Sequence, residues 1–449
     1  MAAAASEVTT ILLLSAFVTA CSAFGYGSAL GYSSPTQSGI MEDLNLSVAE
    51  FSLFGSILTV GAILGAAISG KITDLLGRKG TMWVLSLFYI SGWIAIAFAK
   101  VPWLLDLGRL SLGFTNGVSG YLSAVYMAEI TPKELRGKFS AIVPVVLCWG
   151  MSFMYLVGSF VHWRTLALIA TIPGLLQITL LFFIPESPRW LAKVGREKEV
   201  EAVLLRLRGP KVDVSQEAAE IKDYTQFLQC ESKGAILDVV QGKYAHTLLV
   251  MAGVLGLLSL GGIGAFAFYS GAILLSAGIS SMVGLITLAA VQTLAGVWNG
   301  MLLDKAGRRP LLLVSLAGLC FGSFLTGFSF LLKDFNWWNK GTPILALIGL
   351  MVYMASQVLA SGIPWLLIAE VFPVNVKGSA GTICNLVFNV CSWGIAYYFN
   401  FLIEWSAIGV FFTFAAFCGA NFILTAKLVP ETKGKRLEEI QDEITQSSQ

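Results

Sequence analysis

The amino-acid sequence predicts an all-α integral membrane protein with twelve transmembrane helices arranged in two six-helix bundles. Three observations support this prediction. The chain of 449 residues is 56% hydrophobic and only 12% charged, whereas an average soluble domain carries about 25% charged residues. It contains twelve apolar windows long enough to cross a bilayer, and loop motifs of its first half return in the same order in its second half.

The apolar windows define the predicted helices. A helix needs about 20 apolar residues to cross a hydrocarbon core about 30 Å thick. Windows of this kind lie at about 8–32, 51–70, 81–99, 103–128, 138–161, 163–184, 246–275, 281–303, 311–332, 343–369, 378–402 and 405–428. The chain also holds 46 Gly, a residue that membrane helices tolerate better than soluble helices do.

Three loop segments repeat along the chain. Residues 74–79 match 304–309, residues 129–137 match 370–378, and residues 185–187 match 430–432, at offsets of 230, 241 and 245 residues. The order of the three segments is the same in both copies. The chain is therefore built from one half used twice, an arrangement typical of secondary transporters in membranes.

The distribution of cations predicts the orientation. With twelve spans, both tails and the even-numbered loops share one side, and that side holds 24 of the 29 Lys and Arg. The positive-inside rule makes it the cytosolic side, so both termini are expected in the cytosol. The first window is not expected to be a cleaved signal, since no basic residue precedes it and cleavage would remove one span of the repeat.

The repeat and the polar stretch between its halves give the domain boundaries. We expect an N-terminal bundle at 1–184, a cytosolic linker at 185–245, a C-terminal bundle at 246–428 and a cytosolic tail at 429–449. In the linker, Val200, Val203, Leu204 and Leu207 have the spacing of an amphipathic helix, and Ser215 opens a second short helix. We interpret this segment as a latch across the inner mouth, with a plain tether as the alternative.

The charged residues of the repeated loops are candidates for a cytosolic gate. An Asp near a helix end, a tight Gly turn and two cations can clamp neighbouring helices by charge-assisted hydrogen bonds. Orientation signals alone do not explain the repeated acidic residues, because the positive-inside rule ignores them. We expect ion pairs that separate when the gate opens, formed by Asp74, Arg78, Lys79, Glu129, Arg136, Asp304, Arg308, Arg309, Glu370 and Lys377.

Several segments resemble signatures of known transporters. Residues 70–79 resemble the loop 2–3 signature of the major facilitator superfamily, and residues 299–309 resemble its loop 8–9 counterpart. Pro185 to Leu191, Pro430 to Gly434, Gly108-Arg109-Leu110 and Gly362-Ile363-Pro364-Trp365 resemble the sugar porter family within it. Residues 30–35 and 46–56 resemble the plant early-responsive-to-dehydration type. The resemblance implies the major facilitator fold and transport of a monosaccharide or similar polyol by alternating access.

The same resemblance locates departures in the sugar path. Positions that usually carry amide side chains hold Leu258, Ser259 and Gly264 in helix 7 and Pro144 in helix 5, and helix 11 has Phe388 where many members have Asn. Each unpaired sugar hydroxyl costs about 1–3 kcal/mol, so these losses should weaken or reshape sugar binding.

Six residues remain as candidate substrate-binding residues. Trp365 is the strongest, because Pro364 breaks its helix and broken membrane helices tend to line cavities. For each aromatic residue the alternative is packing in the core or against lipid. The six are Tyr269, Gln292, Gln357, Trp365, Asn389 and Trp393.

The coupling residues also depart from the family. Proton-coupled sugar porters carry an acid in helix 1 at the position of Gly27, while Arg109, the usual partner of that acid, is present. An Arg in a membrane needs a partner, and we expect Asp106, three residues earlier on the same helix face, to pair with it. The sequence therefore predicts facilitated diffusion, with proton coupling through a non-standard acid as an alternative.

Other function classes fit poorly. The chain has no phosphate-binding Gly-rich loop with its Lys and no cluster of metal ligands, and His162 and His246 are isolated. We expect neither an enzyme nor an ATP-driven pump, and no cofactor. The remaining rival is a non-transporting sensor built on a transporter scaffold. The expected partners are a sugar and the lipid bilayer, and no nucleic acid. We expect a monomer in the vacuolar or plasma membrane.

Overall fold

The computed structural model describes residues 8–132, 135–210, 212–230, 245–305, 307–338, 340–372 and 374–431. Within these residues every regular element is a helix. The helices are α1 (Thr10–Gly31), α2 (Ser33–Leu44), α3 (Val48–Ala97), α4 (Pro102–Ile130), α5 (Arg136–Gly158), α6 (Trp163–Ile169), α7 (Ile172–Leu181), α8 (Pro188–Lys193), α9 (Glu197–Arg208), α10 (Ser215–Cys230), α12 (Ala245–Leu260), α13 (Ile263–Ser276), α14 (Ser281–Lys305), α15 (Arg308–Asp334), α16 (Thr342–Ala360), α17 (Ile363–Val371) and α18 (Val374–Leu428).

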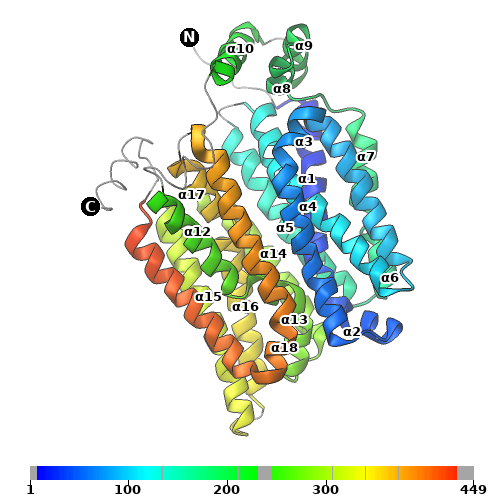
Figure 1. The fold of residues 1–449 in the computed structure, drawn as a ribbon, viewed down its shortest axis with the longest axis vertical. Coiled ribbons are helices and arrows are strands. Elements are labelled where there is room, and N and C mark those ends of the chain that lie inside the picture. Colours follow the sequence, from blue (N-terminus) through cyan, green and yellow to red (C-terminus); the bar gives the residue numbers. More distant parts are fainter. Residues whose placement is uncertain are drawn as a thin grey trace.

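Two of these elements are helical hairpins. The 50 residues of α3 reverse direction at Gly77, whose φ of 79° is open to glycine at little steric cost. The 55 residues of α18 reverse at Ser406, which has extended backbone with a φ of −162° and a ψ of 98°. Both reversals can be followed in Figure 1.

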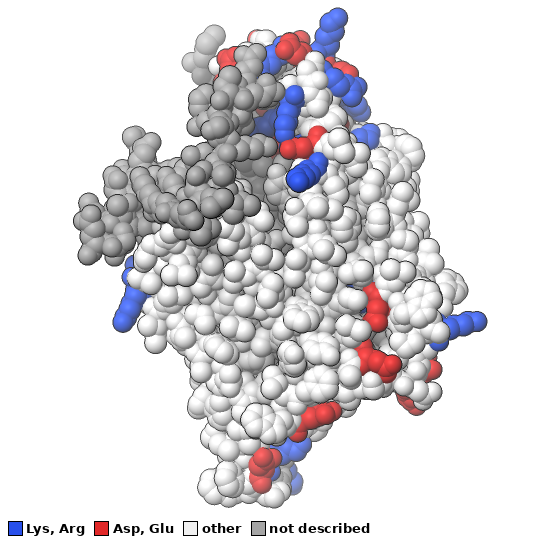
Figure 2. Space-filling view, in the orientation of Figure 1, with Lys and Arg blue, Asp and Glu red and all other residues white. Residues whose placement is uncertain are grey.

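Apolar helices make the chain an integral, multi-pass membrane protein. Eight helical stretches among the described residues are long and apolar enough to cross a membrane, as judged by length and composition. Two of the eight contain the hairpins α3 and α18. Figure 2 agrees with this, since charged side chains gather toward the two ends of the molecule and leave a broad band between them nearly free of charge.

The helices of the first and second halves lie side by side. In Figure 1, α1–α7 form the right side of the molecule and α12–α18 the left side, and α8–α10 cover one end, which we call the linker end. The two sides meet along two seams, α3 against α18 and α5 against α14. Side chains join both seams: Asn400 Nδ2 donates to Ser52 Oγ at 2.9 Å, and Ser152 Oγ donates to Gln292 Oε1 at 3.4 Å.

The first two helices differ from the predicted windows. The chain continues past α1 as α2, which extends to Leu44 and which the sequence patterns did not predict. Helix α3 begins at Val48, ahead of the predicted residue 51, because Ser47 and Glu50 form a capping box. Ser47 Oγ accepts from the Glu50 N–H at 3.3 Å, and Glu50 Oε2 accepts from the Ser47 N–H at 2.8 Å.

Glycine allows α3 and α4 to touch backbone to backbone. A Cβ atom on Gly113 would lie 2.1 Å from the carbonyl oxygen of Leu58, and one on Gly117 would lie 2.2 Å from that of Ala62. Small residues at such crossings drive helix association in lipid, where apolar burial gives no advantage. The pair α3 and α4 therefore forms a rigid unit of the first half.

This contact predicts an unequal response to alanine at two glycines. Gly113→Ala should destabilise the fold by about 1–3 kcal/mol through overpacking, whereas Gly394→Ala in α18, where nothing lies within 4 Å of the added Cβ, should not. Thermal unfolding of the purified variants in detergent measures the difference. Equal unfolding midpoints for the two variants would contradict the backbone contact.

Candidate functional site

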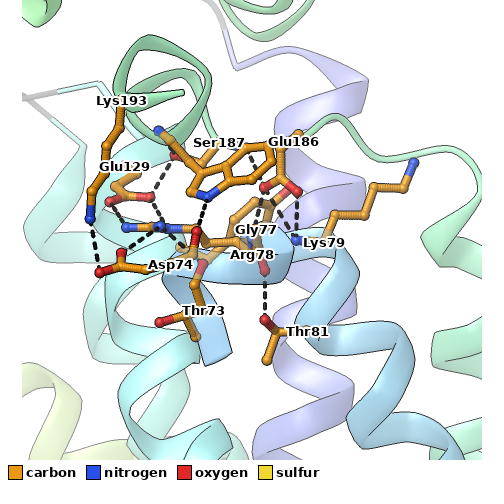
Figure 3. Close-up of polar contacts among 12 residues, drawn as sticks. Thr73, Asp74, Gly77, Arg78, Lys79, Thr81, Glu129, Glu186, Ser187 and Lys193 are labelled. Carbon is orange, nitrogen blue, oxygen red and sulfur yellow. Dashed lines mark hydrogen bonds and ion pairs between the residues drawn. The ribbon is translucent and has the colours of Figure 1, made fainter. Parts of the chain in front are cut away.

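A cluster of polar and charged side chains surrounds the α3 turn at the linker end (Figure 3). Arg78 lies at its centre, and its Nε and Nη2 atoms each donate to the carboxylate of Glu129, at the end of α4, at 2.8 Å. Both side chains are mostly buried, with exposed fractions of 9% and 11%. Two parallel charge-assisted bonds fix the angle as well as the distance between the groups, so this pair clamps the α3 turn to α4.

Helix α8 adds a second layer to the cluster. Ser187, its N-cap, donates from Oγ to Glu129 Oε2 at 2.6 Å. Trp190 Nε1 donates to the carbonyl oxygen of Asp74 at 2.8 Å, and Lys193 Nζ lies 2.8 Å from Asp74 Oδ2. Helix α8 is therefore held to both α3 and α4 (Figure 3).

Glu186 fixes the turn itself. Its carboxylate accepts the backbone N–H of Arg78 at 2.9 Å, of Lys79 at 3.1 Å and of Ser187 at 2.7 Å. A Cβ on Gly77 would lie 2.5 Å from Glu186 Oε2, so the carboxylate occupies the space a side chain would need. Burial raises the pKa of Glu186 above its usual value, and the three N–H donors oppose that shift.

The second half repeats this arrangement at the α15 N-terminus. Glu431 accepts the backbone N–H of Arg308 at 3.0 Å and of Arg309 at 3.2 Å. A Cβ on Gly307 would lie 2.5 Å from Glu431 Oε2, the same distance as at the first turn. Arg308 Nη2 lies 3.4 Å from Glu370 Oε1, which corresponds to the bond between Arg78 and Glu129.

The second cation of each loop also has an equivalent place. Lys79 Nζ donates to the carbonyl oxygen of Ile184 at 2.9 Å. The Arg309 guanidinium donates to the carbonyl oxygen of Ala426. Arg309 thus binds a carbonyl in the last turn of α18, where the helix dipole favours positive charge, and Lys79 binds a carbonyl just beyond the end of α7.

The structure brings together most of the predicted gate residues. Asp74, Arg78, Lys79 and Glu129 lie in the first cluster, and Arg308, Arg309 and Glu370 lie in the second. The described ion pairs of each cluster lie within one half, except that Lys193 of the linker helix α8 pairs with Asp74 of the first half. The side chains of Arg136, Asp304 and Lys377 lie outside the described residues.

Sequence reasoning missed the two carboxylates that hold the turns. Glu186 and Glu431 were read only as parts of a repeated segment, although their offset of 245 residues was available as a signal. Ser187 belongs to the same segment and binds Glu129. Lys193 had no signal of its own, because its contact with Asp74 depends on how α8 is oriented.

Tyr269, a predicted substrate-binding residue, is fully buried at an irregular residue of α13 with a φ of −125° and a ψ of 15°. Its hydroxyl donates to the carbonyl oxygen of Ala396 at 2.8 Å, and its ring stacks on Phe399 with the centroids 5.3 Å apart. A Cβ on Gly55 of α3 would lie 2.5 Å from the same hydroxyl oxygen. Tyr269 thus fills the junction of α3, α13 and α18.

Gln292 is likewise occupied by protein contacts. It is 2% exposed, accepts from Ser152 Oγ, and directs its Nε2 to Met151 Sδ at 3.3 Å. Ser152 and Met151 belong to α5, on the other side of the seam. In this conformation Gln292 joins the two halves.

The other candidates lie on α16, α17 and α18. Gln357 is buried, and its Oε1 has no hydrogen-bond partner in the described part of the chain. Trp365 is partly exposed and meets Phe388 edge to face with the ring centroids 5.9 Å apart. Asn389 Nδ2 donates to Asn385 Oδ1 at 2.6 Å. Asn385 was missed, although its spacing of four residues from Asn389 places both amides on one helix face.

Trp393 has a more exposed environment. It is 37% exposed and stacks on Tyr397 with the centroids 6.1 Å apart. Leu386 and Val390, on the preceding turns of α18, are 50% and 48% exposed. Trp393 therefore borders the apolar outer face of this helix.

The residues of the predicted helices 7 and 5 that depart from the family's sugar path lie on α12, α13 and α5 of the structure. Leu258 is 2% exposed and packs in a hydrophobic core that residues of both halves share, and Ser259 is fully buried with a hydroxyl that has no partner among the described residues. A Cβ on Gly264 would lie 3.1 Å from Ser392 Oγ. Pro144 lies inside α5.

The predicted pair of Asp106 and Arg109 does not form. Arg109 is fully buried and donates to the carbonyl oxygens of Ala29 at 2.6 Å and Phe54 at 3.4 Å, and to the hydroxyl of Ser33. Its guanidinium also lies 4.8 Å from the Phe54 ring centroid. Acceptors on α1, α2 and α3 satisfy this cation, and Asp106 lies at the partly exposed side of α4 without it.

Comparisons with known proteins cover nearly the whole chain. The family described as "Sugar (and other) transporter" matches residues 9–444. The chain is 50% identical over 444 residues to "Sugar transporter ERD6-like 15" of Arabidopsis thaliana, covering 98% of this chain and 93% of that protein. It is 44% identical over 440 residues to "Sugar transporter ESL1" of the same plant, covering 98% and 94%.

Solved structures resemble the fold. The inward-open conformation of the xylose transporter XylE from E. coli superposes with a TM-score of 0.79 at 22% identity, covering 96% of this chain and 99% of that one. The proton:xylose symporter XylE bound to 6-bromo-6-deoxy-D-glucose gives a TM-score of 0.77 at 20% identity, covering 97% and 99%.

The buried clamp predicts a strong effect from removing one charge. Glu129→Gln leaves Arg78 buried without its partner and should destabilise the protein by about 3–5 kcal/mol. The matched control is Glu199→Gln, which breaks the exposed pair with Arg196 and should change stability by less than about 1 kcal/mol. Thermal unfolding measures both. Similar midpoints for the two variants would show that the clamp does not stabilise the fold.

Proposed function

The chain belongs to the sugar transporter family of the major facilitator superfamily, and we propose that it moves a monosaccharide or similar polyol by facilitated diffusion. The observation that carries the sugar class is the identity of 50% over nearly the whole length to a named sugar transporter. The chemistry is translocation only, since its relatives and fold neighbours are transporters and not enzymes. A non-transporting sensor is less favoured, because both halves retain the Glu-held turns at the linker end.

The packing around Gly27 supports an uncoupled mechanism. A Cβ at Gly27 would lie 1.9 Å from the carbonyl oxygen of Leu147 and 2.9 Å from the backbone nitrogen of Met151, both on α5. A Cβ at Gly150 would lie 2.2 Å from the carbonyl oxygen of Phe24 on α1. Helix α5 thus occupies the space that an acidic side chain at this position of helix 1 would need. Arg109 takes carbonyl and hydroxyl acceptors in its place.

We propose twelve spans. The eight apolar stretches of the described residues are single crossings or hairpins: α1, α6 with α7, α12 with α13, α14, α15, and α16 with α17 cross once, while the hairpins α3 and α18 cross twice. Helices α4 and α5 add one crossing each. An even number of spans puts both termini on one side, and the cation distribution makes that side the cytosol. The linker end is then the cytosolic end.

The proposed domains follow from this count. Residues 1–184 and 246–428 form two six-helix bundles, 185–245 form the cytosolic linker and 429–449 the cytosolic tail. The contacts of the Arg78 and Arg308 clusters hold helices within each half. We propose that they keep each bundle rigid while the bundles rock against each other, in place of a ring of pairs that breaks at every cycle.

Helix α13 of the second half contacts α2 and α3 of the first half. The ring of Tyr269 meets Phe51 of α3 edge to face, and the backbone N–H of Gly271 donates to Ser34 Oγ at 2.8 Å, which ties α13 to α2. We propose that opening toward the non-cytosolic side requires these contacts to separate. Tyr269 then acts in closure, and Gln292 at the inter-half seam, more than in direct sugar binding.

We propose that the sugar contacts Gln357, Trp365, Asn385 and Asn389, with Trp393 at the edge of the path. These residues supply amide groups and one partly exposed aromatic ring from α16, α17 and α18. The protein acts as a monomer without nucleic acid, in the vacuolar or plasma membrane.

Transport tests this assignment. Liposomes containing the protein should show counterflow of at least one labelled sugar among glucose, fructose, galactose and inositol. Trp365→Ala and Asn385→Leu should reduce it about tenfold or more, since each lost contact to a sugar is worth about 1–3 kcal/mol. The control Trp405→Ala, at a position that is 84% exposed, should transport normally. Silence with every sugar would favour the sensor, and transport unaffected by both variants would move the site elsewhere.

Coupling is tested separately. A pH gradient imposed on these liposomes should not drive sugar above its equilibrium distribution, whereas a proton symporter in the same vesicles accumulates it. Gly27→Asp should lower the thermal unfolding midpoint, because the added side chain overlaps α5, and should not create accumulation. Uphill transport by the unmodified protein would refute facilitated diffusion.

A further inference from the structure

A small cavity lined by several polar side chains lies inside the first half, between α1, α3, α4 and α7. Side chains lining it include Ser22 and Tyr26 of α1, Tyr89 of α3, Asn116 of α4 and Gln177 of α7. These residues fall near the middle of their helices, far from either charged end of the molecule. The proposed sugar contacts lie in the other half, so this cavity is separate from them.

Two glycines shape the cavity. A Cβ on Gly25 would lie 3.0 Å from the ring of Tyr89, and one on Gly174 would lie 2.7 Å from it. The Tyr89 hydroxyl donates to the carbonyl oxygen of Ala170 at 2.9 Å. The ring is therefore fixed between α1 and α7, and it keeps these helices from closing over the polar groups beside it.

One of those polar groups has no partner. Gln177 Nε2 donates to Ser22 Oγ at 2.6 Å, which links α7 to α1. Asn116 is 3% exposed, and its Nδ2 has no hydrogen-bond partner among the described residues. A buried amide hydrogen left unpaired costs about 1–3 kcal/mol, and lipid supplies no acceptor.

The cavity also separates two tightly packed units. Helices α1 and α5 meet backbone to backbone at Gly27, and α3 and α4 do so at Gly113. Between α1 and α4, on the inner side of these pairs, the structure places Ser22, Tyr26 and Asn116 around open space instead of a glycine contact.

We propose that this cavity binds ordered water, which accepts from Asn116 Nδ2 and bonds to the polar groups of α1 and α7. Water suits the site because the free space holds about one or two molecules. Polar cavities with two to four partners within reach are the ones that hold water in proteins. A hexose is too large for this space, and no charged side chain lines it to bind an ion.

Radiolytic hydroxyl labelling tests the proposal, since radicals formed from a bound water modify the side chains next to it. The full chain in lipid nanodiscs is irradiated and modification is quantified by mass spectrometry. Cys21 and Tyr89 line the cavity and are 7% and 5% exposed. Cys418 and Tyr353 are the controls, at 1% and 0% exposed, with no part in the cavity.

Cys21 and Tyr89 should be modified several-fold faster than Cys418 and Tyr353. Asn116→Leu, which removes the amide and fills the space, should bring the rates at Cys21 and Tyr89 down to those of the controls. Equal rates in the unmodified protein would overturn the proposal, whether or not the variant folds. An experimental density map that shows other buried waters but no density in this cavity would also overturn the proposal.

Discussion

The structure depends on contacts between helix backbones at glycine. Inside a membrane the lipid is as apolar as the side chains, so helices associate through close packing. At Gly27 and Gly113 the neighbouring carbonyl oxygen lies about where a Cβ would be, which joins α1 to α5 and α3 to α4 as pairs. The contact at Gly27 also removes the space for an acidic side chain in helix 1. The proposed lack of proton coupling is thus a property of packing as well as of residue identity.

Glycine also permits close contacts at the linker end, where a carboxylate and not a helix backbone fills the space beside it. Gly77 and Gly307 each lie under a carboxylate, Glu186 and Glu431, that accepts the next two backbone N–H groups. The same carboxylate–backbone contacts occur in both halves, which indicates that each carboxylate holds the turn of its own half. We propose that each half moves as a unit, with the motion between the halves at the seams and at the junction where Tyr269 meets α3.

Much of the fold could be predicted from the sequence. The apolar windows predicted the helices, and the repeated loop segments predicted the two charged clusters, because both signals depend only on local composition and spacing. The partners of Arg109 could not be predicted, since they are backbone carbonyls that every residue carries. Gln292 and Tyr269 are predicted from the family resemblance to bind sugar, yet their contacts depend on how the halves meet, which local patterns do not encode. Asn385 could have been predicted from the sequence, because its spacing of four residues from Asn389 places both side chains on one helix face.

The seams between the halves have a consequence for the speed of exchange between conformations. Each is joined by a neutral pair of one hydroxyl and one amide, Ser52 with Asn400 and Ser152 with Gln292. Such a bond contributes only about 1 kcal/mol net, so breaking the hydrogen bond at each seam costs little free energy. Tyr269 of the second half meets Phe51 of the first half edge to face, with the ring centroids 6.3 Å apart. The activation enthalpy of turnover should therefore reside in separating one aromatic pair, and the polar seams should contribute little to its temperature dependence.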